Sequence, residues 1–111
     1  MSMTEHHTAV AEVLIDIEQE LRILRLWENQ PPAPEALAST QPFAVDTLSF
    51  PQWLQFIFIP RMYFMINAEA PLPTDCGVAP MAEQYFSAIK LHSAPLITHL
   101  QRIDSLLTRR N

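Results

Sequence analysis

The side chains best suited to acid–base chemistry or metal binding in this chain are its four histidines, and their spacing matches no recognised site. His6 and His7 are adjacent near the N-terminus, and His92 and His99 lie near the C-terminus. Pro95 stands between the last two, near an expected helix start, so they need not share a helical face. No His-Glu-x-x-His pattern or carboxylate–histidine pair accompanies any of them. We therefore expect exposed or helix-capping histidines and no metal site.

Cys76, the only cysteine, has none of the features of a reactive thiol. A single cysteine excludes an intrachain disulfide and any cysteine-rich zinc site. No basic residue stands near it in the sequence to favour the thiolate, and no base can be identified that would activate it. Glu83 and Asp104 are isolated acids on expected helices, where we expect water to surround them. We therefore predict no catalytic residue, no cofactor and no independent enzymatic activity.

Glycine content and net charge exclude further classes of function. Gly77 is the only glycine, whereas dinucleotide-binding folds and P-loops need several glycines to bring backbone N–H groups close to phosphate. The net charge of −5 disfavours nucleic-acid binding, which requires clustered Lys and Arg. The only adjacent basic pair, Arg109 and Arg110, is better placed to complement a helix dipole than to contact phosphates. Direct binding of nucleic acid is therefore not expected.

Length and composition indicate one globular domain spanning residues 1–111. Hydrophobic residues make up 49% of the chain and charged residues only 17%, so the chain can bury a core but has few charges for its surface. The N-terminus lacks the basic and apolar regions of a signal peptide. The longest apolar stretch, residues 56–66, is too short and too interrupted to span a bilayer. We expect a cytoplasmic protein without a membrane contact.

Hydrophobic periodicity predicts a long first helix over residues 4–28. Its apolar residues recur at spacings of three and four, which is typical of an amphipathic helix. These residues are Val10, Leu14, Ile17, Leu21 and Leu24. Pro31 and Pro32 are expected to end the helix. Residues 30–47 then form a proline-rich loop, and a loop of that length must pack along the domain or have a function.

A second helix is predicted to begin at Ser49, where Gln52 would complete a capping box. It continues to about Ala68, with a kink or a break at Pro60, which removes a backbone donor and crowds the preceding turn. The remaining helices are expected over residues 80–90, opened by Pro80, and from Ser93 to Arg110. Together these helices predict an all-α fold: an antiparallel four-helix bundle with unequal helices and a long proline-rich loop between helices 1 and 2.

Residues 30–82 have the most unusual composition in the chain. They hold nine of the ten prolines and seven of the ten aromatic residues, but only five charged residues. Arg61 is the only basic residue among them, and two roles are open for it. It could bond to loop carbonyls or pair with Asp46, which would tie the long loop to the second helix. It could instead bind a carboxylate or a phosphate of a partner.

Five short motifs follow one another through this part of the chain. They are Ser-Thr-Gln-Pro-Phe at 39–43, Asp-Thr at 46–47, Trp-Leu-Gln-Phe at 53–56, Ile-Pro-Arg-Met at 59–62 and Leu-Pro at 72–73. Together with the chain length and the amphipathic terminal helices, they resemble the YqcC-like family of small bacterial proteins of unknown function. The resemblance implies an all-helical bundle in the bacterial cytoplasm, and no established catalytic residues. Some relatives are encoded beside a tRNA pseudouridine synthase, which implies a loose link to RNA modification.

These observations favour a non-enzymatic protein-interaction module that uses the loop at 39–47 and the helix at 50–68. A deficit of charge beside an excess of aromatic residues is typical of a surface that another protein, or a second copy of the chain, covers. The candidate interface residues are Thr40, Gln41, Phe43, Asp46, Trp53, Gln55 and Arg61. One alternative is a small-molecule pocket near Arg61, gated by the long loop, with Gln41 as a further polar contact. Another is an accessory role to an RNA-modifying enzyme such as a tRNA pseudouridine synthase.

Overall fold

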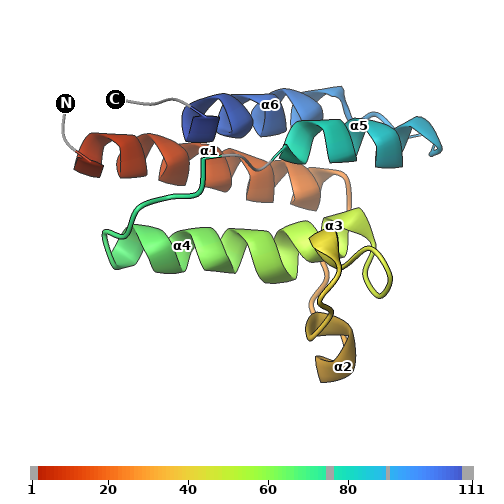
Figure 1. The fold of residues 1–111 in the computed structure, drawn as a ribbon. Coiled ribbons are helices and arrows are strands. Elements are labelled where there is room, and N and C mark those ends of the chain that lie inside the picture. Colours follow the sequence, from red (N-terminus) through yellow and green to blue (C-terminus); the bar gives the residue numbers. More distant parts are fainter. Residues whose placement is uncertain (1–2, 75–76, 90, 109–111) are drawn as a thin grey trace.

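The computed structural model describes residues 3–74, 77–89 and 91–108, and within these ranges the chain is all-α, as predicted (Figure 1). In chain order the elements are α1 (Met3–Ile23), α2 (Pro34–Leu37), the 3₁₀ turn η1 (Pro42–Ala44), α3 (Phe50–Trp53), the π-helical turn η2 (Leu54–Phe58), α4 (Ile59–Asn67), α5 (Val78–Ser87) and α6 (Ala94–Thr108). Because α3, η2 and α4 follow one another without a gap, they form one helix, called the central helix below.

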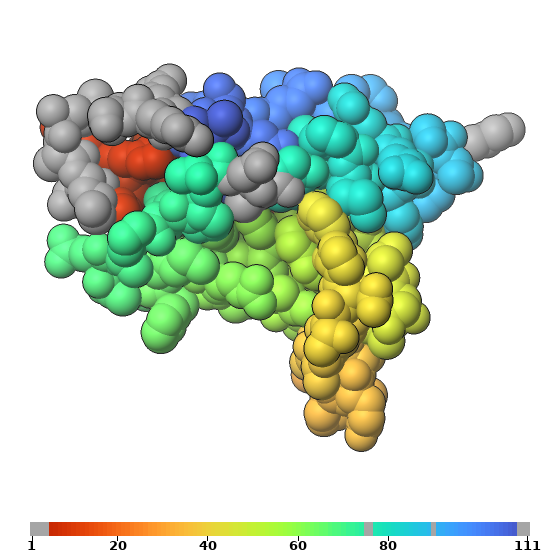
Figure 2. Space-filling model, in the orientation of Figure 1, coloured from red at the N-terminus to blue at the C-terminus, as the bar shows by residue number. Residues whose placement is uncertain are grey.

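Within the described residues, four helices form the body of the protein: α1, the central helix, α5 and α6. Consecutive helices of these four run in opposite directions (Figure 1). α1 packs against both α6 and α4, while α5 packs on α6 and contacts α3. The short α2 belongs to the loop between α1 and the central helix, and it stands away from the body (Figures 1 and 2). The α2 part of the long proline-rich loop therefore projects from the bundle, whereas η1 packs against α3.

The core between α1 and α6 is made of aliphatic side chains that are fully or almost fully buried. They are Val10, Val13, Leu14, Ile17 and Leu21 from α1, and Leu96, Leu100, Ile103 and Leu107 from α6. Burying each such side chain contributes about 1.5–3 kcal/mol. Arg102 and Asp16 also form an ion pair between the two helices, at 3.9 Å, but such an exposed pair contributes at most about 1 kcal/mol. Apolar packing therefore holds the two helices together.

α1 ends at Ile23, well before the two prolines that were expected to end it. The helix closes with a Schellman motif, in which the N–H of Arg25 donates to the carbonyl of Arg22 at 3.0 Å. The N–H of Leu26 donates to the carbonyl of Leu21 at 2.8 Å, and the Leu26 side chain packs against the core. The predicted end at residue 28 was wrong because apolar residues continue past the point where the backbone reverses.

The end of α1 provides a test of backbone strain. Arg25 has a φ of 62°, a left-handed conformation that disfavours residues with a Cβ by about 1 kcal/mol relative to glycine. We expect Arg25→Gly to raise the free energy of unfolding by about 0.5–1 kcal/mol, measured by urea denaturation. Gln19→Gly, at an exposed site inside α1, should instead lower it by about 1 kcal/mol. An Arg25→Gly protein no more stable than the parent would contradict this account.

Ser49 caps the central helix as predicted. The N–H of Gln52 donates to Ser49 Oγ at 3.3 Å, and the N–H of Ser49 donates to Gln52 Oε1 at 2.9 Å. The helix is not broken at Pro60. In the π turn just before it, the N–H of Ile59 donates to the carbonyl of Leu54. Pro60 has no N–H and its ring crowds the carbonyl four residues back, and a wider π turn accommodates both effects.

α5 begins at Val78, two residues before the proline that was expected to open it. Asp104 of α6 explains this start, because its carboxylate accepts the N–H of Val78 at 2.9 Å and that of Ala79 at 2.7 Å. These are two of the N–H groups that a helix start leaves without partners, and the negative charge complements the helix dipole. The expectation of a solvated Asp104 was therefore wrong, since this residue caps a neighbouring helix. Glu83 is exposed, and Gln101 Nε2 donates to its carboxylate at 3.3 Å.

Two histidines at the start of α1 make hydrogen bonds to distant backbone. His7 Nε2 lies 2.7 Å from the carbonyl oxygen of Ala70, and His6 Nε2 lies 2.7 Å from that of Leu106. His7 is buried, so the expectation of an exposed or capping role was wrong for this residue. Among the described residues, no three His, Cys, Asp or Glu side chains cluster where they could hold a metal ion. Cys76, Lys90, Arg109 and Arg110 lie outside the described residues.

The helices in the described ranges all fall short of the combined length and apolarity that a membrane crossing would require.

Burial raises the pKa of the Tyr63 phenol above its usual value of 10.0, and the negative charge of Glu18 raises it further. The folded protein therefore keeps this proton where the unfolded chain has lost it. The resulting contribution to stability is present below about pH 10 and is lost as the pH rises above that value. In a Tyr85→Phe background, we expect the phenolate absorbance to rise with a midpoint above about pH 10, and Glu18→Gln to lower the midpoint. A midpoint that Glu18→Gln leaves unchanged would exclude the electrostatic part of this account.

Candidate functional site

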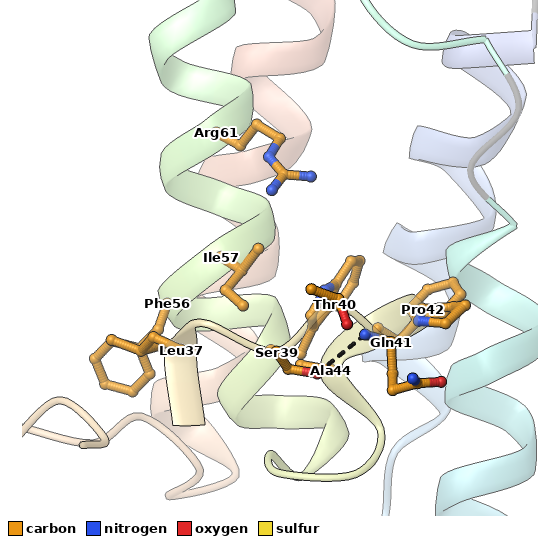
Figure 3. Close-up of a pocket in the computed structure, with 11 residues that line it drawn as sticks. Leu37, Ser39, Thr40, Gln41, Pro42, Ala44, Phe56, Ile57 and Arg61 are labelled. Carbon is orange, nitrogen blue, oxygen red and sulfur yellow. Dashed lines mark hydrogen bonds between the residues drawn. The ribbon is translucent and has the colours of Figure 1, made fainter. Parts of the chain in front are cut away.

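A hollow of about 560 Å³ lies between the projecting loop and the central helix (Figure 3). We call it the loop–helix hollow. The loop side of its lining consists of Leu37, Ser39, Thr40, Gln41, Pro42, Phe43 and Ala44, and the helix side consists of Trp53, Phe56, Ile57 and Arg61. Its volume is within the range of sites that hold small ligands, and its mixture of rings and polar groups also suits a side chain of a partner protein.

Short hydrogen bonds hold the loop in shape. Ser39 Oγ donates to Asp46 Oδ1 at 2.5 Å and accepts the N–H of Gln41 at 3.1 Å. Thr47 Oγ1 donates to the carbonyl of Ala36 at 2.7 Å, which connects the end of the loop to α2. Asp46 therefore supports the loop and does not line the hollow.

Two successive residues of the loop have a left-handed backbone conformation. The φ angle is 59° at Phe43 and 49° at Ala44, and each such residue costs on the order of 1–3 kcal/mol. Two contacts offset this cost: the ring centroids of Phe43 and Trp53 are 4.7 Å apart, and Ala44 is 3% exposed. The strained turn therefore places the Phe43 ring against the central helix, where it forms part of the wall of the hollow.

The π turn directs Trp53 and Arg61 towards the same face of the central helix. In a regular α-helix, residues eight apart differ in direction by about 80°. A π turn takes up roughly one more residue per turn, which reduces the difference to about 20°. Both side chains accordingly line the hollow. Pro60, which favours the wider turn, thus helps to set the geometry of the site.

Arg61 is exposed, and its guanidinium has no hydrogen bond or ion pair within the part of the chain that the structure describes. Of the two roles left open for Arg61, the tie to Asp46 or to loop carbonyls is therefore wrong for the described residues, and Asp46 accepts a hydrogen bond from Ser39 instead. Figure 3 shows the Arg61 side chain extending towards the side of the helix where Thr40 and Pro42 lie. No Asp or Glu occurs among the described residues that line the hollow. Its wall thus carries one positive charge and no negative charge.

The structure brings together five of the seven candidate residues: Thr40, Gln41, Phe43, Trp53 and Arg61. Gln55 lies elsewhere, because it is buried on the other side of the turn. Its Nε2 donates to the carbonyl of Glu28 at 2.8 Å, and its Oε1 accepts the N–H of Glu28 at 2.9 Å. Gln55 therefore does not line the hollow, and it anchors the chain that follows α1.

Six lining residues were not among the candidates: Leu37, Ser39, Pro42, Ala44, Phe56 and Ile57. Three of these, Ser39, Pro42 and Phe56, lie within the motifs of the family resemblance. Ile57 could have been found from spacing, because it is four residues from both Trp53 and Arg61. Leu37 had no signal beyond its apolar character.

The apolar surface continues beyond the hollow along α4. A second depression of about 280 Å³ shares the walls formed by Phe43, Trp53 and Arg61 and reaches Met65 and Pro73. Phe64, three residues after Arg61 and so on a neighbouring part of the helix surface, is 74% exposed. Exposed apolar side chains therefore continue along α4 beyond Arg61.

Comparisons with known proteins relate the chain to one family of bacterial proteins. Residues 9–106 match the DUF446 family, described as tRNA pseudouridine synthase C. The uncharacterised protein YqcC of Escherichia coli K12 is 35% identical over 100 residues, which are 90% of this chain and 92% of YqcC. An uncharacterised protein of Haemophilus influenzae is 38% identical over 71 residues, 64% of this chain and 67% of that protein.

A third relative is much longer. A Pectobacterium carotovorum protein named tRNA pseudouridine synthase C is 44% identical over 64 residues, 58% of this chain but only 17% of that protein.

The fold of a relative is also known from experiment. The solution NMR structure of E. coli YqcC is similar with a TM-score of 0.84 and 33% sequence identity, covering 96% of this chain and 91% of that one. This likeness and the family match over residues 9–106 confirm the resemblance inferred from the motifs. The chain therefore belongs to the YqcC-like family, DUF446, whose bacterial members include uncharacterised all-helical proteins.

Proposed function

We propose that this protein is a non-enzymatic protein-interaction module whose binding surface is the loop–helix hollow. The observation that carries the proposal is that one open hollow contains the rings of Phe43 and Trp53 together with Arg61, which has no partner among the described residues. Arginine and large aromatic residues are enriched at protein interfaces, and tryptophan and arginine are common among the few residues that supply most of the binding energy. Half-buried rings also gain further apolar contact when a partner excludes water from them.

The partner that we propose is a tRNA pseudouridine synthase. The Pectobacterium protein of that name contains a stretch similar to 64 residues of this chain within a longer polypeptide, and the family description carries the same name. Two units within one polypeptide meet at a high effective concentration. When the units are separate chains, a binding surface has to supply that association. With a net charge of −5, this protein would contact the enzyme and not its tRNA.

Isothermal titration calorimetry tests this proposal. The purified chain is titrated into the tRNA pseudouridine synthase C of the same bacterium. The synthase chosen must not itself contain a segment similar to this chain. We expect saturable binding that Phe43→Ala weakens by about 30-fold, as for a residue whose loss costs about 2 kcal/mol at an interface. Ile15→Ala, at an apolar position of α1 that is 50% exposed, should leave the affinity unchanged.

Circular dichroism and light scattering accompany this titration, so that unfolding and self-association are separated from loss of binding. No binding to the synthase, or equal effects of Phe43→Ala and Ile15→Ala, would contradict the proposal. A dimer that Phe43→Ala dissociates would identify a second copy of the chain as the partner instead.

A small-molecule site is the second candidate function, because the hollow has a volume of about 560 Å³ and contains aromatic walls with polar groups. Under this alternative, a metabolite library should contain a compound that raises the melting temperature of the parent protein. The effect should disappear in Arg61→Ala and persist in Arg102→Ala, which removes an equivalent charge from α6. A library without such a compound would leave the interaction module as the better explanation of the hollow.

A further inference from the structure

We propose that the loop–helix hollow recognises an acidic residue next to a bulky apolar residue in a partner polypeptide, with Arg61 binding the carboxylate. This inference rests on the proposed interaction function and specifies the chemistry of the partner. It concerns the side chains that the hollow accepts, and so it can be tested without knowing the full partner.

The charge of the hollow favours an anion. Arg61 has no partner among the described residues, and no carboxylate lines either of the two depressions that it borders. Elsewhere in the described chain, Arg22 pairs with Glu18 at 3.1 Å and Arg102 approaches Asp16 to 3.9 Å. Unlike these two arginines, Arg61 has its fork of N–H donors available, as does Arg25 at the end of α1, but only Arg61 lines the hollow. That fork matches a carboxylate in two parallel hydrogen bonds.

Further polar side chains line the same hollow, farther along it than the guanidinium (Figure 3). The side chains of Thr40 and Gln41 are exposed, and within the described residues neither makes a hydrogen bond through its side chain. Both line the same hollow as Arg61. A carboxylate that accepts two hydrogen bonds from Arg61 keeps further acceptor positions for water. Thr40 and Gln41 are then available to other polar groups of the segment that carries this carboxylate.

The remaining wall suits an apolar side chain that is attached to that carboxylate through a peptide. Phe43 and Trp53 line both depressions. On α4, the exposed Phe64 extends the apolar surface past Arg61. A small organic acid would cover only a part of this surface, and a nucleic acid would need clustered basic residues in place of one arginine. A polypeptide segment can fill the hollow and cover the neighbouring surface at once.

The test is selection of a displayed library of random short peptides on the immobilised full-length protein. Recovered peptides are synthesised, and their affinities are measured by fluorescence anisotropy. We expect Asp or Glu next to Leu, Phe or Trp in the recovered sequences. Replacing that acid by its amide should weaken binding roughly tenfold, and Arg61→Ala should have the same effect. Arg61→Lys should retain only part of the affinity, and Arg102→Ala should retain all of it.

A double-mutant cycle makes the assignment specific to the Arg61–carboxylate contact. If the two groups bind each other, the peptide amide and Arg61→Ala together should weaken binding no further than either change alone. Additive losses, recovered peptides without an acid, or a selection that recovers no peptide would overturn the proposal. Citrate or acetate binding as tightly as the peptides would also overturn it in favour of a small-molecule site. Failure of the synthase to bind would refute the proposed partner only, because the peptide result does not depend on it.

Discussion

Asp104→Ala is expected to lower the free energy of unfolding by about 3 kcal/mol, equivalent to a fall of about 10 °C in the melting temperature. The substitution removes the carboxylate that accepts the N–H groups of Val78 and Ala79 at 2.9 and 2.7 Å. Hydrogen bonds to a charged acceptor contribute about 1.5–3 kcal/mol each. Because Asp104 is only half-buried, the expected loss of stability is smaller than the sum of the contributions of the two hydrogen bonds. Urea and thermal unfolding followed by circular dichroism measure the change.

Two further variants separate capping from the general loss of an acidic residue. Asp104→Asn keeps the shape of the side chain but turns an NH₂ group towards one of the two N–H donors, so its cost should be intermediate. Asp46→Ala removes an exposed aspartate that accepts one hydroxyl donor, and it should cost less than about 1 kcal/mol. Equal costs for Asp104→Ala and Asp46→Ala would show that the cap on α5 does not stabilise the fold.

Asp104 also shows which features of the fold could be predicted from the sequence. The capping box of Ser49 and Gln52 is a local pattern, and it forms as predicted. The early start of α5 depends on an acid 26 residues further along the chain, which no local pattern reveals. The reversal at Arg25 was missed for a different reason, because a Schellman motif usually has glycine at this position and here has arginine. Local signals thus placed the helices, whereas the start of α5 depended on a contact between helices and the end of α1 on an unusual residue in a local motif.

The candidate site was predictable to a similar extent. The motifs and the excess of aromatic residues identified the loop and the central helix as its two walls. They could not show that Phe43 and Ala44 adopt a left-handed conformation, since such a turn depends on the contact between Phe43 and Trp53. Pro60 indicated a local distortion of the helix, but not that a π turn would align Trp53 with Arg61. The composition of the site was therefore visible in the sequence, and its geometry was not.

Gln55→Leu is expected to lower the free energy of unfolding by about 2–4 kcal/mol. Gln55 is 6% exposed, and its amide bonds to both the N–H and the carbonyl of Glu28. Leucine has a similar size but leaves both backbone groups without these partners, at about 1–3 kcal/mol for each unsatisfied group. Phe56→Leu provides a control one position along, where the side chain lines the hollow. We expect that control to change stability by less than about 1.5 kcal/mol, because one apolar side chain replaces another.

The variant Gln55→Glu tests the same contact through its dependence on pH. At neutral pH the carboxylate can accept the N–H of Glu28 but cannot donate to its carbonyl. Burial and the facing carbonyl oxygen both disfavour the charged form, so the pKa of the introduced Glu is raised in the folded protein. Protonation restores a donor, and the stability difference between Gln55→Glu and the parent should therefore shrink as the pH falls through that raised pKa. A difference that stays constant with pH would mean that Gln55 stabilises the fold by filling space. A difference that shrinks would establish the amide as a two-sided hydrogen-bonding link between the central helix and the chain that follows α1.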